Sequence, residues 1–391
     1  MRKLRGIILG LIFIMYTFIL NNNYVYAEVN ENDKIEVLFI SSFNSDFISF
    51  NDQVEGLKSG LDNNCNINIE YMNFKIFDSY ESEENFFNLL KYKLETYENI
   101  DVIIAGDDEA AEFCLKYRDD LFKGVPISFL GVQDYVRRER ALEYDLVSGV
   151  TEVESIRENI ELIKKLHPNV DTINFIDSFG INLYDEILSE YEEFNINWII
   201  TNDIPINEVK NILCELDKND VVIKLYVNNF SDNNYLGVKE IDKIINEGCN
   251  NIPIYNILNY DIGQGSVGGK VINHFNQGKK AGEIAIGLLN GESNEDIYIK
   301  DDSANEYIFD YKALRKFGIK TSDLPVSSKI INNPIDVIRE YKNIIISNIL
   351  LLLSLVVIII TLICYIRRKR IYEKEILKAM NTAEEANRVK S

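Results

Sequence analysis

The strongest constraint on this chain is an uninterrupted apolar segment near its carboxyl end. Residues 344–366 read IIISNILLLLSLVVIIITLICYI without a charged side chain, and the basic cluster RRKR follows directly at 367–370. About 20 apolar residues are needed to cross the roughly 30 Å hydrocarbon core of a membrane, because backbone polar groups in lipid must be satisfied within one helix. The segment therefore predicts a transmembrane helix with a cytoplasmic basic flank.

A second apolar segment lies at the amino end. Basic residues within the first five positions precede an apolar run at 7–20, which ends near the tripeptide VYA. For residues 1–27 this pattern predicts either a secretory signal peptide, cleaved after VYA, or an uncleaved membrane anchor. With both basic flanks in the cytoplasm, we expect residues 28–342 outside the plasma membrane and 367–391 inside it under either alternative.

The expected outer portion is strongly acidic. The whole chain has a formal net charge of −21, and because both ends are basic, the outer portion carries more than all of this negative charge. Such a surface argues against nucleic acid and against an anionic membrane surface as partners of the outer domain. A solvated acidic surface without a specific partner is the simpler interpretation.

Cysteine and histidine are too few and too scattered to predict a metal centre. The chain has five cysteines and two histidines, and no CxxC pair. We therefore expect no zinc site and no cofactor. Buried free thiols are the expected state of the external cysteines, with a disulfide as the alternative.

From Lys34 onward, β-rich runs alternate with amphipathic helical stretches. Strands that are buried on both faces read as continuous apolar runs, and their alternation with helices predicts parallel sheets. Two successive series of this kind predict an α/β fold with two lobes. The expected strands are 35–41, 67–74, 101–106 and 126–132, then 172–177, 196–200, 220–227 and 253–258. The expected helices are 51–61, 83–98, 108–122, 153–166, 181–194, 205–216 and 237–247.

The lobe boundaries follow from two expected crossings between the lobes. SGVTE (148–152) and YDIGQGSVGGK (260–270) look like crossing strands, and their glycines supply the backbone freedom of a hinge. The following segment has an expected helix at 275–290 and short strands near 296–300 and 305–309. The expected bilobed domain is 34–333, with lobe 1 at about 34–147 and 266–333 and lobe 2 at about 148–265.

Ligands of open α/β sheets bind beyond the carboxyl ends of the strands, where loops and helix N-termini converge. The loops at these ends carry carboxylates and aromatic rings, which suit a small organic ligand such as an amino acid, an amine or a sugar, clasped by lobe closure. Helix capping is the simpler role for Asp107 or Asp108, and Phe43, Tyr135 and Tyr260 are equally expected as packed aromatics. The candidate ligand-binding residues are Ser42, Phe43, Asp107, Asp108, Gln133, Asp134, Tyr135, Asp177, Ser178, Tyr226, Tyr260 and Asp261.

An enzymatic outer domain is the weaker hypothesis. Acidic side chains abound for hydrolysis by paired carboxylates, but the sequence contains neither a GxSxG elbow nor an HExxH motif. We therefore expect no catalytic residue within these 391 residues.

Several stretches carry a family likeness. They include VLFISSFNSDF, the block from DVIIAGDDEAAEF to GVPISFLGVQDY, ELIKKLHPNV, GGKVINHFNQGKKAGEIAIGLLNGE and NEYIFDYKALRKFGI. Over about residues 34–333 the chain resembles the substrate-binding-protein-like sensor domain of bacterial membrane receptors. That domain is related to ABC-transporter binding proteins with the type I periplasmic fold. The tail AEEANRVKS resembles the linker that runs into the phosphoacceptor helix of sensor histidine kinases.

The resemblance implies the input module of a two-component histidine kinase whose kinase core lies outside these residues. We expect the outer domain to bind its ligand by hinge closure and to bias a rearrangement of the membrane helix, in a homodimer. One alternative is a membrane-attached solute-binding protein of an ABC transporter. The other is the sensor of a diguanylate cyclase.

Overall fold

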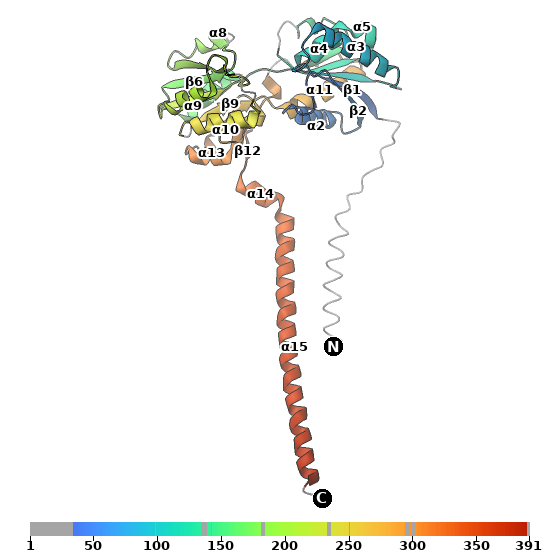
Figure 1. Cartoon of the computed structure of the whole chain (residues 1–391), viewed down its shortest axis with the longest axis vertical. Helices are drawn as coiled ribbons and strands as arrows, with labels where there is room; N and C mark the ends of the chain where they lie inside the picture. Colours follow the sequence, from blue (N-terminus) through green and yellow to red (C-terminus); the bar gives the residue numbers. More distant parts are fainter. Residues whose placement is uncertain are drawn as a thin grey trace.

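The structure, a computed structural model, describes residues 34–97, 99–133, 139–141, 143–180, 184–232, 236–249, 251–293, 298 and 302–388. Two α/β lobes lie side by side, and one long helix extends from them as a stem (Figure 1). The signal peptide or anchor expected at 1–27 lies outside the described residues, as does most of the strand expected near 296–300.

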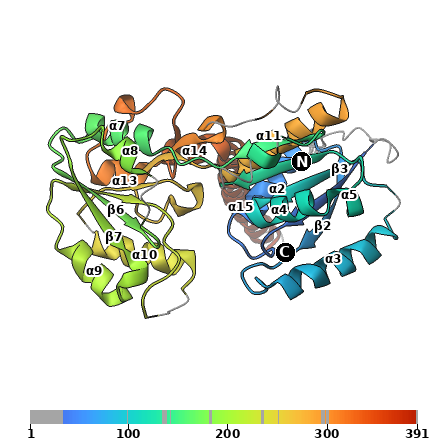
Figure 2. The same ribbon diagram turned by 90° about the horizontal axis from the view of Figure 1, so that it is seen from above.

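The first lobe is built on five parallel strands in the order β2-β1-β3-β4-β5. Helices cover both faces of this sheet, α2 and α11 on one and α3 and α4 on the other (Figure 2). The strands are β1 (Ile35–Ser41), β2 (Cys65–Tyr71), β3 (Val102–Gly106), β4 (Ile127–Val132) and β5 (Val147–Thr151). The helices are α2 (Phe50–Gly60), α3 (Tyr80–Leu94), α4 (Asp107–Lys116), α5 (Arg118–Leu121) and α11 (His274–Leu289).

Side-chain alternation explains why β1 reads as a continuous apolar run. Val37 and Phe39 pack against α2 and α11, whereas Leu38 and Ile40 pack on the opposite face, and all four side chains are fully buried. Successive side chains of a strand point to opposite faces, so a strand covered on both sides must be apolar throughout. Burying each such side chain stabilises the fold by roughly 1.5–3 kcal/mol before the entropic cost of ordering the chain.

The second lobe is built on seven strands in the order β12-β11-β10-β9-β8-β6-β7. All neighbours are parallel except β10 and β11, which are antiparallel. The strands are β6 (Thr172–Asp177), β7 (Asn195–Ile200), β8 (Asp220–Lys224), β9 (Ile254–Asn256), β10 (Gly268–Val271), β11 (Glu306–Asp310) and β12 (Lys329–Ile331). The helices are α7 (Ile156–Leu166), α8 (Asp185–Leu188), α9 (Ile206–Cys214), α10 (Val238–Gly248) and α13 (Tyr311–Lys316), with 3-10 turns η3 (Thr201–Asp203), η4 (Asn259–Asp261), η5 (Asp302–Ala304) and η6 (Thr321–Asp323).

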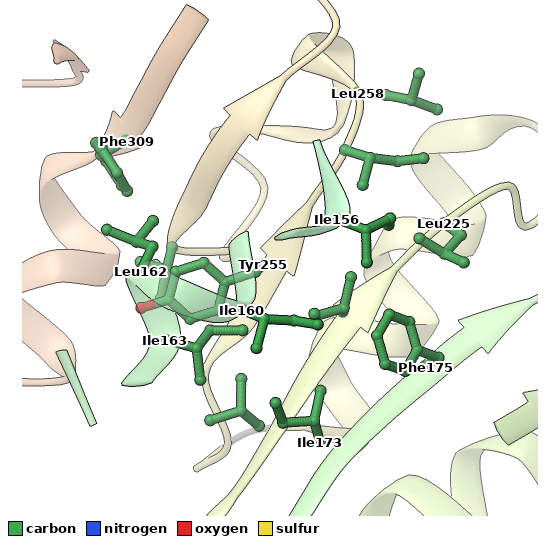
Figure 3. Packing of buried hydrophobic residues seen from close by; sticks show 14 of the residues in the cluster. Ile156, Ile160, Leu162, Ile163, Ile173, Phe175, Leu225, Tyr255, Leu258 and Phe309 are labelled. Atoms are coloured by element: carbon green, nitrogen blue, oxygen red, sulfur yellow. The ribbon is translucent and has the colours of Figure 1, made fainter. Parts of the chain in front are cut away.

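Tyr255 lies within the core of the second lobe, among Ile160 and Ile163 of α7 and Phe175 of β6 (Figure 3). Its ring is fully buried, and its hydroxyl lies 2.9 Å from Nε2 of His167. A buried hydroxyl without a partner would cost free energy, so His167 has the structural role of satisfying it.

The helix expected at 181–194 is only partly present. The described part of that stretch contains the single turn α8, and the chain then bends so that Tyr191 is buried in the core. Burial of this aromatic ring takes precedence over continuation of the helix.

The lobe boundaries expected from the sequence are wrong at two places. Residues 148–151 belong to β5, which pairs with β4 of the first sheet, so they are not a crossing. The residues of β10, β11 and β12 join the second sheet, because β10 pairs with β9, β11 pairs with β10, and β12 extends the edge beyond β11. From the segment 266–333, α11 and Ala304 do pack in the first lobe.

In the described part of the chain, three connections join the lobes. They are 152–155, 272–273 and the link that follows Ala304. The first and third connections are tied together, because Nδ2 of Asn305 donates a hydrogen bond to the carbonyl oxygen of Val153 at 2.7 Å. The hinge therefore consists of three connecting segments, whereas the sequence predicted two.

The glycines of 260–270 serve the second sheet and not the hinge. Gly268 has φ +113°, and a Cβ at this position would overlap the carbonyl oxygen of Ile308 on β11. Only glycine combines that backbone conformation with such a close approach. The backbone freedom predicted there is real, but it allows β10 to pair with β11.

The stem is α15 (Lys342–Arg388), a 47-residue helix that continues from the predicted transmembrane segment through the basic cluster into the tail, as the sequence predicted. Among the described helices it is the one that is long and apolar enough to cross a membrane. The short helix α14 (Pro334–Glu340) joins it to β12, so the stem leaves from the second lobe (Figure 1).

Glycines allow α2 and α11 to pack at backbone contact. Gly56 and Gly60 lie on α2, and Gly278 and Gly282 lie on α11. A Cβ on Gly56 or on Gly278 would overlap a backbone oxygen of the facing helix. This contact holds α11 in the first lobe, although the strand before it belongs to the second.

We predict that Gly278→Ala lowers the free energy of unfolding by about 1–3 kcal/mol, because the backbones must separate to admit the methyl group. Gly237→Ala is the matched control, since a Cβ at Gly237 meets no atom within 4 Å. Urea unfolding of the full chain in detergent, followed by circular dichroism, measures both. Equal stability of the two variants would contradict the proposed packing.

Candidate functional site between the lobes

Ser42 caps the helix that follows β3. Its Oγ accepts a hydrogen bond from the backbone N of Ala110 and donates one to the carbonyl oxygen of Gly106, both at 2.8 Å. The side chain that satisfies the start of α4 therefore comes from the loop after β1. Asp107 makes no side-chain cap, which leaves its carboxylate available for another role.

Asp107 is held in an unusual backbone conformation. Its φ is +69°, a region that non-glycine residues seldom occupy, and a Cβ on the neighbouring Gly131 would lie 2.5 Å from its Oδ1. Oδ1 accepts a hydrogen bond from Nε2 of Gln53 at 3.1 Å, whereas Oδ2 is buried without a partner. Burial, with some repulsion from Asp108, raises the pKa of Asp107 to about 7.

A polar network joins the lobes at the hinge. Gln133 follows β4 in the first lobe, and its Nε2 lies 2.5 Å from the hydroxyl of Tyr226, which follows β8 in the second. The same Nε2 donates to Oε1 of Glu152 at 2.7 Å. The Tyr226 hydroxyl lies 2.9 Å from Oε1 of Glu154 and 3.2 Å from Oε1 of Glu152. Both glutamates belong to the first hinge connection, so lobes and hinge share one set of hydrogen bonds.

Glu152 is nearly inaccessible to solvent, with 7% of its surface exposed. Burial, followed by repulsion from Asp107 and Glu154, raises the pKa of Glu152 to about 8. Asp107 follows β3 and Glu152 follows β5, and the repulsion between their carboxyls places both in one environment.

His274 begins α11 and faces the same region. Its Nε2 lies 4.0 Å from Oε2 of Glu152, and its Nδ1 lies 2.7 Å from Oδ1 of Asn259 in η4. Tyr260 stacks on the imidazole with ring centroids 5.4 Å apart. Burial lowers the pKa of His274 to about 4, so the ring is neutral at physiological pH.

Asp177 and Ser178 hold their own loop together. Asp177 accepts hydrogen bonds from the backbone N atoms of Tyr226 and Gly180, at 3.1 and 3.0 Å. Oγ of Ser178 accepts from the backbone N of Asn228 at 2.7 Å. These contacts position Tyr226, so both residues support the site from the second lobe.

Asp261 lies in a buried ionic cluster of the second lobe. Nζ of Lys224 lies 2.8 Å from Oδ1 of Asp261 and 2.6 Å from Oδ1 of Asp242 on α10. Burial alone would lower the pKa of Lys224, but the two carboxylates raise it. The cluster fixes η4, and with it Tyr260, to the second lobe.

Phe43 packs against Phe47 with ring centroids 4.2 Å apart. Nζ of Lys75 lies over both rings, 5.5 Å from the Phe43 centroid and 4.5 Å from that of Phe47. Phe43 thus forms a cation–π contact within the first lobe.

The fold and this geometry agree with the outcome of comparison with known proteins. Residues 40–329 match the family described as ABC transporter substrate binding protein. The chain belongs to this family. The match covers both lobes and stops short of the stem. No curated protein matches the chain.

Solved structures show the same fold. A ligand-free, open substrate-binding protein with adhesive properties from Clostridium difficile aligns with a TM-score of 0.55 and 19% identity, covering 76% of this chain and 99% of that one. An ABC domain in complex with L-Trp from Streptococcus pneumoniae aligns with a TM-score of 0.52 and 16% identity, covering 76% of this chain and 100% of that one. The expected two-lobed periplasmic-binding-protein-like fold is therefore confirmed.

The structure brings part of the predicted site residues together between the lobes. Asp107, Gln133, Tyr226 and Tyr260 lie around it, and Asp108 joins it through its Oδ2, which accepts from the backbone N of Gln133 at 3.4 Å. Ser42, Phe43, Asp177, Ser178 and Asp261 have the internal partners described above. Asp134 and Tyr135 lie outside the described residues.

Glu152 and His274 were missed. Glu152 directly follows a strand, so the rule that nominated the other loops would have found it had residues 148–152 been assigned to the first sheet. His274 carries no comparable signal, because its position depends on the packing of α11. Among the described residues, no cluster of His, Cys, Asp and Glu could hold a metal ion.

We predict that the free energy of unfolding of the domain falls as the pH rises from about 4 to about 8. The folded-state pKa values of Asp107 and Glu152, about 7 and 8, lie above their ordinary values, so the folded state binds protons more tightly than the unfolded state. The resulting stabilisation is complete below about pH 4 and is lost as the pH rises through the folded pKa values. His274 has the opposite effect between its lowered pKa of about 4 and the ordinary value of 6.5, and it offsets part of this fall.

In the double variant Asp107→Asn, Glu152→Gln, the change in the free energy of unfolding across this pH range should be smaller by about 1 kcal/mol or more. Thermal unfolding in the same buffers measures it. Asp46→Asn, which removes an exposed carboxylate from the same lobe, is the control and should keep the wild-type slope. If the stability of the double variant depends on pH as that of the wild type does, the raised pKa values do not belong to Asp107 and Glu152.

Proposed function

We propose that this chain is the input module of a membrane receptor. The outer domain binds a small organic ligand between its lobes and closes about the hinge of three connecting segments. This closure alters the position of α15. The observation that carries the proposal is the continuity of one helix from the exit of the second lobe, through an apolar span, into a charged tail.

The attachment of the stem determines which lobe moves. β12 is the edge strand of the second sheet, and Nδ2 of Asn332 just beyond it hydrogen-bonds to Asp310. Asp310 also caps α13, accepting from the backbone N atoms of Lys312 and Ala313 at 2.7 and 3.0 Å. The second lobe is therefore fixed to the stem, and closure moves the first lobe relative to it.

Ligand-driven signalling needs a difference in affinity between the open and closed arrangements. The contact between Gln133 and Tyr226 joins the lobes at a point that a ligand would also touch. A homodimer in the plasma membrane, with residues 28–342 outside and 367–391 inside, would allow closure to alter the packing of two adjacent stems. The histidine-kinase output belongs to this proposal and follows from the resemblance of the tail.

Family membership equally supports a solute-binding protein that delivers its ligand to an ABC permease while attached to the membrane. The two functions differ in what the cytoplasmic end contacts. Coding sequence for a phosphoacceptor helix downstream of Ser391 supports the kinase, and a diguanylate cyclase motif supports the other receptor class. Co-purification with permease subunits supports the transporter.

We predict that a ligand of the outer domain raises the melting temperature of the full chain in detergent, because it binds the folded state alone. Tyr226→Phe should weaken the affinity for that ligand severalfold, with the shift measured from the melting temperature of the free variant, which lacks the hydrogen bonds of the hydroxyl. Tyr92→Phe, an exposed tyrosine on α3, is the control. A panel of metabolites in which no compound raises the melting temperature would contradict ligand binding.

We predict opposite compartments for the outer domain and the tail. A membrane-impermeant maleimide should label Cys214, an exposed thiol of α9, in intact cells. In a Cys214→Ser background, Glu385→Cys should be labelled only after the membrane is permeabilised. Labelling of both positions in intact cells would exclude a receptor that spans the membrane.

A further inference from the structure

Three hydrogen-bond acceptors in the interlobe site lack donors among the described residues. The first is Oδ2 of Asp107, which is buried and has no partner. Its other oxygen is used by Gln53. A buried carboxylate oxygen without a donor is costly, so its retention indicates that something outside the described residues satisfies it.

The second acceptor is Oε2 of Glu152. The hydrogen bonds from Gln133 and Tyr226 both reach Oε1, whereas Oε2 faces Nε2 of His274 at 4.0 Å. Within the described part of the chain, neither Glu152 nor Asp107 forms an ion pair with a lysine or arginine. Lys75 attracts Asp107, but its ammonium group packs over the rings of Phe43 and Phe47.

The third acceptor is Nε2 of His274, and a chain of hydrogen bonds fixes it in that role. Nδ2 of Asn259 donates to Oδ2 of Asp52 at 3.1 Å, which turns Oδ1 of Asn259 toward Nδ1 of His274. Oδ1 can only accept, so Nδ1 carries the hydrogen of the neutral ring, and Nε2 has a lone pair. Once Glu152 is ionised, its Oε2 and the Nε2 of His274 present two acceptors to each other, 4.0 Å apart, with no hydrogen between them.

We infer that the ligand carries a primary ammonium group, which binds among Asp107, Glu152 and His274. The inference rests on the proposed function and names the chemical class of its ligand, a small organic amine. An ammonium group has three N–H donors and one positive charge, which match three acceptors and the uncompensated carboxylates. A hydroxyl or an amide would supply fewer donors and no charge.

The surrounding charges favour the same ligand. Four carboxylates, Asp107, Glu152, Asp242 and Asp261, raise the pKa of the Tyr260 phenol in addition to the effect of burial, so the region has a negative potential. Lys224 forms ion pairs with the last two and offsets one of their two charges. Asp107 and Glu152 are left for a cation from solution, whose binding would relieve their mutual repulsion.

The test compares amines with matched neutral analogues on the full chain in detergent. The probes are a series of primary mono- and diamines, each with its N-acetylated form, and a set of sugars as a separate class. Thermal shift and isothermal titration calorimetry measure binding to wild type, Asp107→Asn, Glu152→Gln and the control Asp46→Asn. Each variant is first shown to retain a wild-type or higher melting temperature.

We expect at least one amine to bind, its acetylated form to bind about tenfold more weakly or not at all, and both site variants to lose about tenfold or more in affinity. Asp46→Asn should retain the wild-type affinity. Equal binding of the acetylated form, or full amine affinity in both site variants, overturns the ammonium site. Binding of sugars alone overturns it too, but leaves the proposed receptor function standing. If no compound of any class binds, both the ammonium site and the proposed receptor function are wrong.

Discussion

The backbone contact between α2 and α11 is the constraint on which the interlobe site depends. Gly56 and Gly60 on one helix, and Gly278 and Gly282 on the other, let the two backbones touch, so α11 is held in the first lobe. The chain reaches α11 from the second lobe and leaves it for the second lobe again. Without this contact the return segment would have no reason to bridge the lobes.

The same helix organises the polar groups at the hinge. Gln277, one turn into α11, donates to the carbonyl oxygen of Thr151 at 3.0 Å and accepts from the backbone N of Gly131 at 3.3 Å. It therefore joins the ends of β4 and β5, the two strands that present Gln133 and Glu152. Gly131 in turn leaves room for the carboxylate of Asp107. One buried helix end thus aligns residues from three separate loops, which a flexible hinge could not do.

The two acidic clusters of the domain differ in how their charge is balanced. In the second lobe, Lys224 forms ion pairs with both Asp242 and Asp261, and the resulting cluster anchors η4. At the interlobe site, Asp107 and Glu152 have no comparable described cation, and burial raises the pKa of the carboxyls in both clusters. A buried charge without a partner destabilises a fold, so such a charge is retained where it serves to bind a ligand. The cluster that contains Lys224 is structural, and the one without a described lysine or arginine partner is suited to a ligand.

The sequence alone determined the fold class, the long apolar helix that could span a membrane, and most strands of the two sheets. These features depend on local composition: a strand covered on both faces must be apolar throughout, as in Ile35–Ser41, and a span of lipid requires a long apolar helix. The loops at the strand ends followed from the same pattern, which is why Asp107, Gln133 and Tyr226 were found. Tertiary structure alone decided the third hinge connection, the short strands β10 and β12, and the roles of Glu152 and His274. The strands of three or four residues have no periodicity to detect, and they exist because distant segments pair with them. His274 reaches the site only because glycines far apart in the sequence let two helices touch. No local sequence pattern predicts that contact.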